Sequence, residues 1–162
     1  MKHIRNKTRL ALPESDEYLF RLGVALYGFA SVNSFMTEII CHIDSTQNRT
    51  KLLDITSGRV IAIFRKTIDI AKTKYPQIIP IMEETLDLFS ILNNQRTDFV
   101  HAYPITSSKD GKTQILHRRK DSKGKYFEID ELFLDNFISN LGKVSINLYK
   151  IREQVKKNIK NL

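Results

Sequence analysis

The sequence is poor in cysteine, glycine, proline and tryptophan, and each shortage excludes a class of protein. Among its 162 residues the single cysteine, Cys41, excludes an intramolecular disulfide framework and a multi-cysteine zinc site. Six glycines, four prolines and no tryptophan argue against a repeat-rich β architecture and against a disordered linker. His3 and His117 have no acidic or histidine companions at metal-ligand spacing, so we expect neither a metal ion nor a cofactor.

A long hydrophobic run is also missing. The most apolar stretch, Leu22 to Thr37, lies between Arg21 and Glu38 and is shorter than a bilayer requires. The basic N-terminal segment is not followed by an apolar stretch at signal-peptide spacing. We therefore expect a cytoplasmic protein that does not contact a membrane.

What the chain has in excess is positive charge. Its 26 lysines and arginines and 18 acidic residues give a formal net charge of +8. This balance disfavours a strongly anionic function and favours polyanions as partners. The length and the 41% hydrophobic content suit one packed core, so we expect a single domain over residues 1–162.

Helical periodicity marks four segments, at about 16–42, 56–75, 78 or 80 to 101, and 131–161. Their apolar residues recur every three or four positions. In the last segment these residues form a continuous stripe, composed of Leu134, Phe137, Leu141, Val144, Leu148, Ile151 and Val155. Such spacing in long helices favours packing at about +20°, so we predict an all-α fold, an antiparallel four-helix bundle.

Between the third and fourth helical segments the sequence becomes β-prone and basic. Residues 113–119 and 125–129 favour strands, and residues 120–124 favour a turn, which predicts a β-hairpin inserted at about 113–129. From His101 to Lys125 there are seven lysines and arginines and two aspartates. The candidates for nucleic-acid contact are Lys112, Arg118, Arg119, Lys120, Lys123 and Lys125. The alternative, that these residues only form a solvated face, stays open.

The third helical segment carries two polar residues where its apolar stripe should continue. Asn93 and Arg96 stand between apolar positions of that stripe, and an arginine on a buried face must find an anion or acceptors. His101 follows five residues after Arg96, and Tyr103 comes where Pro104 ends the helix. A purely structural interpretation also stays open, in which the arginine pairs with a nearby aspartate, the histidine caps the helix and the tyrosine packs.

This run resembles the signature of the HEPN superfamily, small α-helical bundles with Arg-x4–6-His near the end of the third helix. Arg96 and His101 match that signature, and His101 to Tyr103 matches the His-x-Tyr extension of HEPN toxins in HEPN–MNT toxin–antitoxin pairs. The order of the helices agrees over essentially the whole chain. Thr97 departs from the family, which usually carries Asn, Asp or His directly after the arginine, and the basic hairpin exceeds the minimal HEPN toxin.

The resemblance implies a metal-independent endoribonuclease of toxin or antiphage-defence type, with RNA as substrate and a site formed across a homodimer interface. Histidine exchanges protons near neutral pH, and the arginine fork fits phosphate oxygens, so His101 and Arg96 are the candidate catalytic residues. As supporting roles we expect Asn93 to orient Arg96 and Asp98 to set the tautomer of His101. Tyr103 matches the tyrosine that a partner nucleotidyltransferase modifies, which implies a cognate antitoxin.

Arg96 and His101 lie about 140° apart around an ideal helix. A single continuous helix therefore does not aim both side chains at one atom, whereas a two-fold axis gathers two copies of each in one cleft. A second hypothesis belongs to another class: a non-catalytic HEPN-like module that binds nucleic acid or a protein. The departure at Thr97 motivates it.

Overall fold

The computed structural model describes residues 5, 7, 10, 12–119 and 126–160. Five α-helices occur in this part of the chain: α2 (Asp16–Ile43), α3 (Arg49–Leu53), α4 (Ser57–Lys74), α5 (Ile79–Val100) and α6 (Glu131–Lys160). A 3-10 turn, Pro76–Ile78, precedes α5. The strands β1 (Tyr103–Thr106), β2 (Gln114–Arg119) and β3 (Tyr126–Ile129) form one antiparallel sheet in the order β1-β2-β3.

The prediction of a mostly helical chain is confirmed, and each of the four predicted helices begins and ends within one residue of its expected position. Local signals explain this agreement. The Ser15 hydroxyl accepts a hydrogen bond from the Tyr18 N–H at 3.1 Å, which caps the start of α2. Pro76 ends α4 and starts the 3-10 turn. The fifth helix, α3, is only five residues long and was not predicted, so the count of four helices is wrong.

The four long helices pack in a ring around the core. Within it α2 contacts α6, α6 contacts α5, α5 contacts α4, and α4 contacts α2. The predicted stripe of α6 is buried along its whole length, from Leu134 to Val155. At the centre the Phe29 ring stacks on Phe89, with ring centroids 5.1 Å apart, and on Phe137, with centroids 6.4 Å apart.

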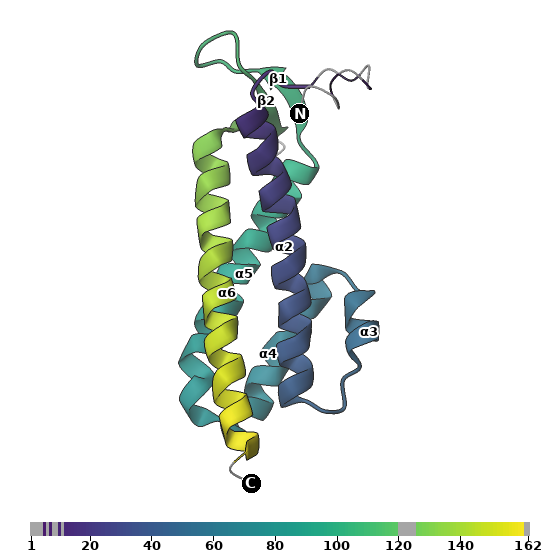
Figure 1. Cartoon of the computed structure of the whole chain (residues 1–162), viewed down its shortest axis with the longest axis vertical. Helices are drawn as coiled ribbons and strands as arrows, with labels where there is room; N and C mark the ends of the chain where they lie inside the picture. Colours follow the sequence, from purple (N-terminus) through teal and green to yellow (C-terminus); the bar gives the residue numbers. More distant parts are fainter. Residues whose placement is uncertain (1–4, 6, 8–9, 11, 120–125, 161–162) are drawn as a thin grey trace.

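The helices α2 and α6 run in the same direction, which corrects the prediction of an antiparallel bundle (Figure 1). Arg21 Nε bonds Asp135 Oδ1 at 2.8 Å near the start of both helices. Arg152 bonds Glu38 Oε1 at 3.4 Å near their other ends. Both pairs join residues 114 positions apart, as only parallel helices in a constant register allow. The apolar periodicity determines which face of a helix is buried but not which way its neighbour runs.

Of the described helices, α2 alone has the length and apolar composition to cross a membrane. One such helix is weak evidence, because a core helix of a soluble protein passes the same test. Nine residues of α2 are buried, and the helix packs against α4 and α6. This packing is consistent with a soluble protein.

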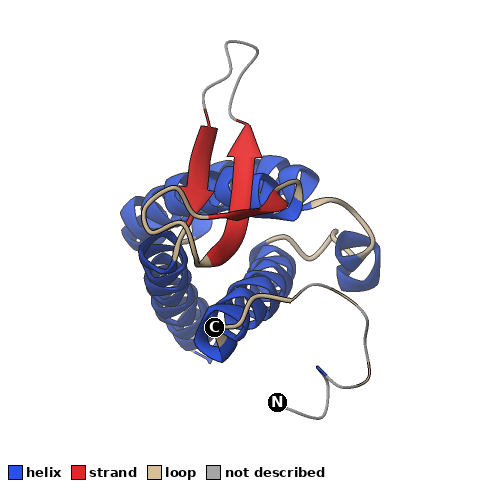
Figure 2. Cartoon of the chain, turned by 90° about the horizontal axis from the view of Figure 1, so that it is seen from above, coloured by secondary structure: helices blue, strands red, loops and turns tan. Residues whose placement is uncertain are grey.

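The sheet lies across one end of the helices (Figures 1 and 2). Both predicted strands are confirmed, whereas the predicted turn at 120–124, with Lys120 and Lys123, lies outside the described residues, as does Lys125. The edge strand β1 was not predicted, because it has only four residues and contains Pro104. Proline is tolerated at a sheet edge, where its missing N–H leaves no rung unpaired.

The hydroxyl of Tyr18 joins α2 to the sheet. It accepts a hydrogen bond from the Leu116 N–H and donates one to the Ile129 carbonyl, both at 2.8 Å. Leu116 and Ile129 face each other across β2 and β3, so the hydroxyl stands between the two strands. The Tyr18 side chain is 1% exposed, and its burial raises its pKa to about 12.

We expect Tyr18→Phe to lower the free energy of unfolding by about 1–3 kcal/mol, because it removes the partner of two backbone groups. Urea unfolding measures the loss, and amide exchange at Leu116 reports whether it is local. The control is Tyr27→Phe, since Tyr27 is 80% exposed and its variant should match the wild type. A Tyr18 variant as stable as the control would show that the strands close directly on each other.

The side chain of Glu128 on β3 stabilises the loop between β1 and β2 through hydrogen bonds. Its carboxylate accepts hydrogen bonds from the Ser108 hydroxyl, the Ser108 N–H and the Ser107 hydroxyl, each at 2.7 Å. These donors, those of Ser108 foremost, lower the pKa of Glu128 from 4.5 to about 2. In the same loop the Thr113 hydroxyl and two backbone N–H groups lower the pKa of Asp110 to about 2. Gly111 completes the turn at φ 65°, a backbone region that favours glycine.

Because the folded-state pKa of Glu128 lies below its unfolded value, its stabilising effect is complete above about pH 4.5 and disappears as the pH falls toward 2. We expect Glu128→Gln to be less stable than the wild type at neutral pH and to approach it near pH 2. Chemical unfolding of both proteins across this range measures the difference. A difference that stayed constant with pH would exclude the ionised carboxylate as its source.

Candidate functional site

The segment from Arg96 to Tyr103 spans the end of α5 and the start of β1. His101 is the C-cap of α5, and its N–H bonds the Thr97 carbonyl at 3.1 Å. Its backbone angles, φ −101° and ψ 11°, already leave the helical region. The His101 side chain is exposed. The end of α5 therefore places the His101 imidazole at the surface, two residues before the first strand of the sheet.

Arg96 is half-buried on α5, and its guanidinium carbon lies 5.8 Å from the centroid of the Phe29 ring. The stem of the side chain thus packs against the aromatic core while the cation is oriented by the ring. Within the described residues Arg96 forms no ion pair, neither with Asp87 nor with Asp98. The described part of the chain thus supplies no counter-anion for this charge.

The two predicted supporting residues of α5 have partners other than those expected. The backbone carbonyl of Asn93 accepts a hydrogen bond from the Thr97 hydroxyl at 3.0 Å. In the described part of the chain, the side-chain amide of Asn93 forms no hydrogen bond with Arg96. The carboxylate of Asp98 faces Arg118 at 3.8 Å, and no bond between Asp98 and His101 occurs there either. The Thr97 hydroxyl uses its proton in a hydrogen bond to its own helix, so it has no donor left for another group.

Tyr103 forms a pair with His117 that the sequence did not indicate. The two residues face each other in the register of β1 and β2. The Tyr103 hydroxyl lies 3.2 Å from His117 Nδ1, and the rings meet edge to face with centroids 5.5 Å apart. Tyr103 is 46% exposed. The pair fixes an aromatic ring on the surface two residues after His101.

Arg118 connects the sheet to the end of α5. One guanidinium nitrogen donates to the His101 carbonyl at 3.2 Å, and Nε lies 3.8 Å from Asp98 Oδ1. Both Arg118 and His117 are close to the predicted site only because β1 pairs with β2. No pattern in the sequence predicted β1, so none could have indicated this proximity.

Of the other predicted nucleic-acid contacts, Lys112 and Arg119 are exposed. Lys112 lies in the loop before β2, where its N–H bonds Asp110 at 2.9 Å, and Arg119 ends β2. In the described residues no group of three or more His, Cys, Asp or Glu side chains could hold a metal ion.

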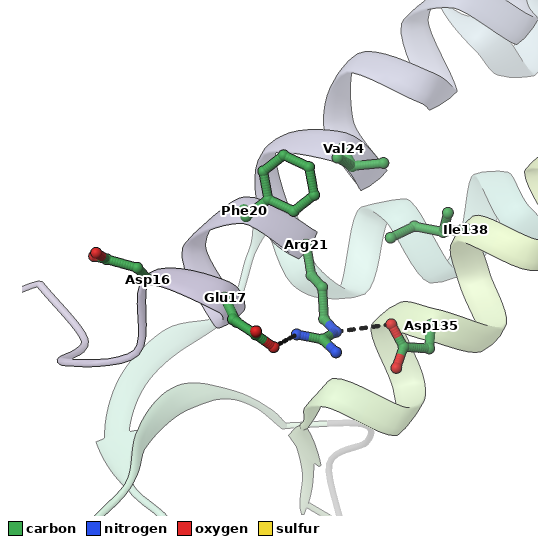
Figure 3. A pocket seen from close by; sticks show the side chains of 7 residues that line it. All are labelled: Asp16, Glu17, Phe20, Arg21, Val24, Asp135 and Ile138. Carbon is green, nitrogen blue, oxygen red and sulfur yellow. Dashed lines mark hydrogen bonds and ion pairs between the residues drawn. The ribbon is translucent and has the colours of Figure 1, made fainter. Parts of the chain in front are cut away.

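A hollow of about 430 Å³ lies between α2 and α6, but none of the predicted site residues lines it. Its walls are apolar at Phe20, Val24 and Ile138 (Figure 3). At its edge Arg21 donates to Glu17 at 3.0 Å and to Asp135 at 2.8 Å, which raises the arginine pKa. Its cation is neutralised by protein carboxylates, so the hollow presents no free charge to a phosphate.

Compared with protein-family models, curated proteins and solved structures, the chain gives no match. Only the residues of the chain itself therefore indicate a function.

We expect Arg96→Met to change the free energy of unfolding by no more than about 1 kcal/mol, the range of an exposed cation–π contact. Methionine keeps the apolar stem, and no carboxylate loses a partner. Arg152→Met is the contrasting variant, because Arg152 bonds Glu38 and lies 4.6 Å from the Tyr149 centroid. Thermal or urea unfolding compares the two. An Arg96 variant as destabilised as the Arg152 variant would assign Arg96 a structural role.

Proposed function

We propose that this protein is a metal-independent endoribonuclease of the HEPN type, acting through Arg96 and His101 in a homodimer. The observation that carries the proposal is the contrast among the arginines of the chain. Among the half-buried arginines that the structure describes, only Arg96 has no carboxylate partner, whereas Arg21 and Arg118, for example, have one. Arg96 lies against Phe29, five residues before an exposed histidine. A cation and an imidazole on one segment are the groups that RNA cleavage needs.

In the proposed reaction the 2′-oxygen of one nucleotide attacks the adjacent phosphorus atom. The new bond joins the 2′-oxygen to phosphorus, and the bond from phosphorus to the 5′-oxygen breaks. His101 takes the proton from the 2′-hydroxyl, and the histidine of a second copy gives a proton to the departing 5′-oxygen. The Arg96 fork stabilises the charge on the phosphate oxygens. The products are a 2′,3′-cyclic phosphate and a 5′-hydroxyl.

The geometry of α5 supports a dimer. Arg96 lies within the helix and His101 at its cap, so the two side chains leave the helix axis in different directions. A two-fold axis past the end of α5 would gather two arginines and two histidines. The ring of four long helices, with α3 as a short addition, is in this proposal a HEPN-like bundle with the sheet inserted between α5 and α6.

The proposal includes the partners of a toxin or antiphage-defence protein. Lys112 and Arg119 are exposed and suit contacts with the RNA backbone. Tyr103 is 46% exposed, which leaves its ring open to a cognate antitoxin such as a nucleotidyltransferase that modifies the tyrosine. Modification there would block the surface beside His101.

The test is cleavage of RNA by the purified protein in excess EDTA. We expect cleavage to survive EDTA, to leave 2′,3′-cyclic phosphates, and to fall by at least about 100-fold in Arg96→Ala and in His101→Ala. The matched control is Arg65→Ala, an exposed arginine on α4, which should cleave like the wild type. Light scattering on the same samples gives the oligomeric state.

Three results would contradict the proposal. Cleavage that stops in EDTA would assign the reaction to a metal ion, and a monomer that cleaves at full rate would exclude a site shared between copies. No cleavage by a folded dimer that still binds RNA would favour the non-catalytic module. The Thr97 hydroxyl donates its proton to its own helix, and this use of the hydroxyl agrees with that second candidate.

A further inference from the structure

Arg118 joins β2 to both the backbone and a side chain at the end of α5. Its terminal nitrogen donates to the His101 carbonyl at 3.2 Å. Its Nε lies 3.8 Å from Asp98 Oδ1, a distance at which the charges attract without a hydrogen bond. The Nε atom is buried and has no hydrogen-bond partner.

Both partners of Arg118 belong to the last turn of α5 and its cap. The carbonyl of a C-cap has no intrahelical donor, and a cation at this end also interacts favourably with the helix dipole. The guanidinium therefore donates a hydrogen bond to an orphan acceptor and at the same time attracts the Asp98 carboxylate. The guanidinium presents separate donors in a fixed plane, whereas a lysine ammonium offers its donors from a single rotating nitrogen and holds the two groups less rigidly.

We infer that Arg118 is a positioning residue for His101: by binding the His101 carbonyl and the Asp98 carboxylate, it fixes the backbone from which the imidazole projects. The inference rests on the proposed function, and it assigns the inserted sheet a part in the same site. It also differs from the prediction that Arg118 contacts nucleic acid. The Arg118 side chain is 32% exposed and its charge is already engaged, unlike that of the exposed Lys112.

The test compares Arg118→Ala and Arg118→Lys with the wild type in RNA cleavage. We expect Arg118→Ala to lower kcat by about 10-fold or more and to leave KM within about twofold of the wild type. The reason is that a small displacement of a catalytic group lowers the rate of the chemical step. Lysine keeps the charge opposite Asp98 but lacks the planar fork. Arg118→Lys should therefore be more stable than Arg118→Ala, while its kcat should stay close to that of Arg118→Ala. The control is Lys109→Ala, which removes an equal charge and an ion pair of 2.6 Å with Asp130.

A second measurement does not depend on activity. We expect the imidazole signals of His101 in NMR spectra to shift in Arg118→Ala, with the His42 signals unchanged and neither set moved in Lys109→Ala. Thermal unfolding of each variant shows whether the sheet remains folded. In a variant whose sheet is lost, Arg118→Lys provides the comparison, since it retains the attraction to Asp98.

The outcomes separate this inference from the proposed function. A raised KM with unchanged kcat would make Arg118 an RNA contact and overturn the inference while the ribonuclease stands. Full kcat in Arg118→Lys would also overturn it, because charge alone would suffice. Should the wild type cleave no RNA, the NMR signals decide: a shift at His101 supports the positioning by Arg118, and unmoved signals refute it.

Discussion

The position of the sheet depends on one buried hydroxyl. Tyr18 bonds Leu116 and Ile129 at the same rung of β2 and β3, and its ring is anchored in the first turn of α2. Because side chains alternate along a strand, a slip of β2 by one residue would turn Arg118 away from α5 and present its neighbour instead. The hydrogen bonds of Tyr18 thus stabilise the register in which Arg118 reaches His101. In this way α2 and β2 both contribute to the candidate site on α5.

The parallel pair of α2 and α6 supplies the frame to which that hydroxyl is fixed. The constant offset of 114 residues, from Arg21 and Asp135 to Glu38 and Arg152, means that the two helices keep their register over most of their length. Between these ends the Phe29 ring stacks on Phe137 and faces the guanidinium of Arg96. The aromatic core that stabilises the helix pair is therefore also the surface that orients the candidate catalytic arginine.

Short-range patterns explain what could be predicted. The stripe from Leu134 to Val155 and the proline at position 76 act within a few turns of one helix, so the helix bounds follow from the sequence. The direction of α6 relative to α2 is set by the chain that returns through the sheet, and no local spacing records it. The role of Arg118 depends on β1, whose four residues include a proline and carry almost no strand signal. At the candidate site, Arg96 was identified as a polar residue on an apolar stripe, and His101 by its place five residues later at the helix end. The proximity of His117 and Arg118 needed the strand register.

Three arginines of the chain differ in the groups that their guanidinium contacts. Arg21 lies between Glu17 and Asp135 and joins two helices, and Arg118 joins the sheet to α5 through Asp98 and a carbonyl. Arg96 packs its stem on Phe29 and, among the described residues, has no counter-anion. Partial burial of an uncompensated charge disfavours the folded state, and the contact with the ring offsets this only in part. A phosphate group at Arg96 would supply the missing anion, so under the proposed function the binding of RNA would stabilise the fold at this charge.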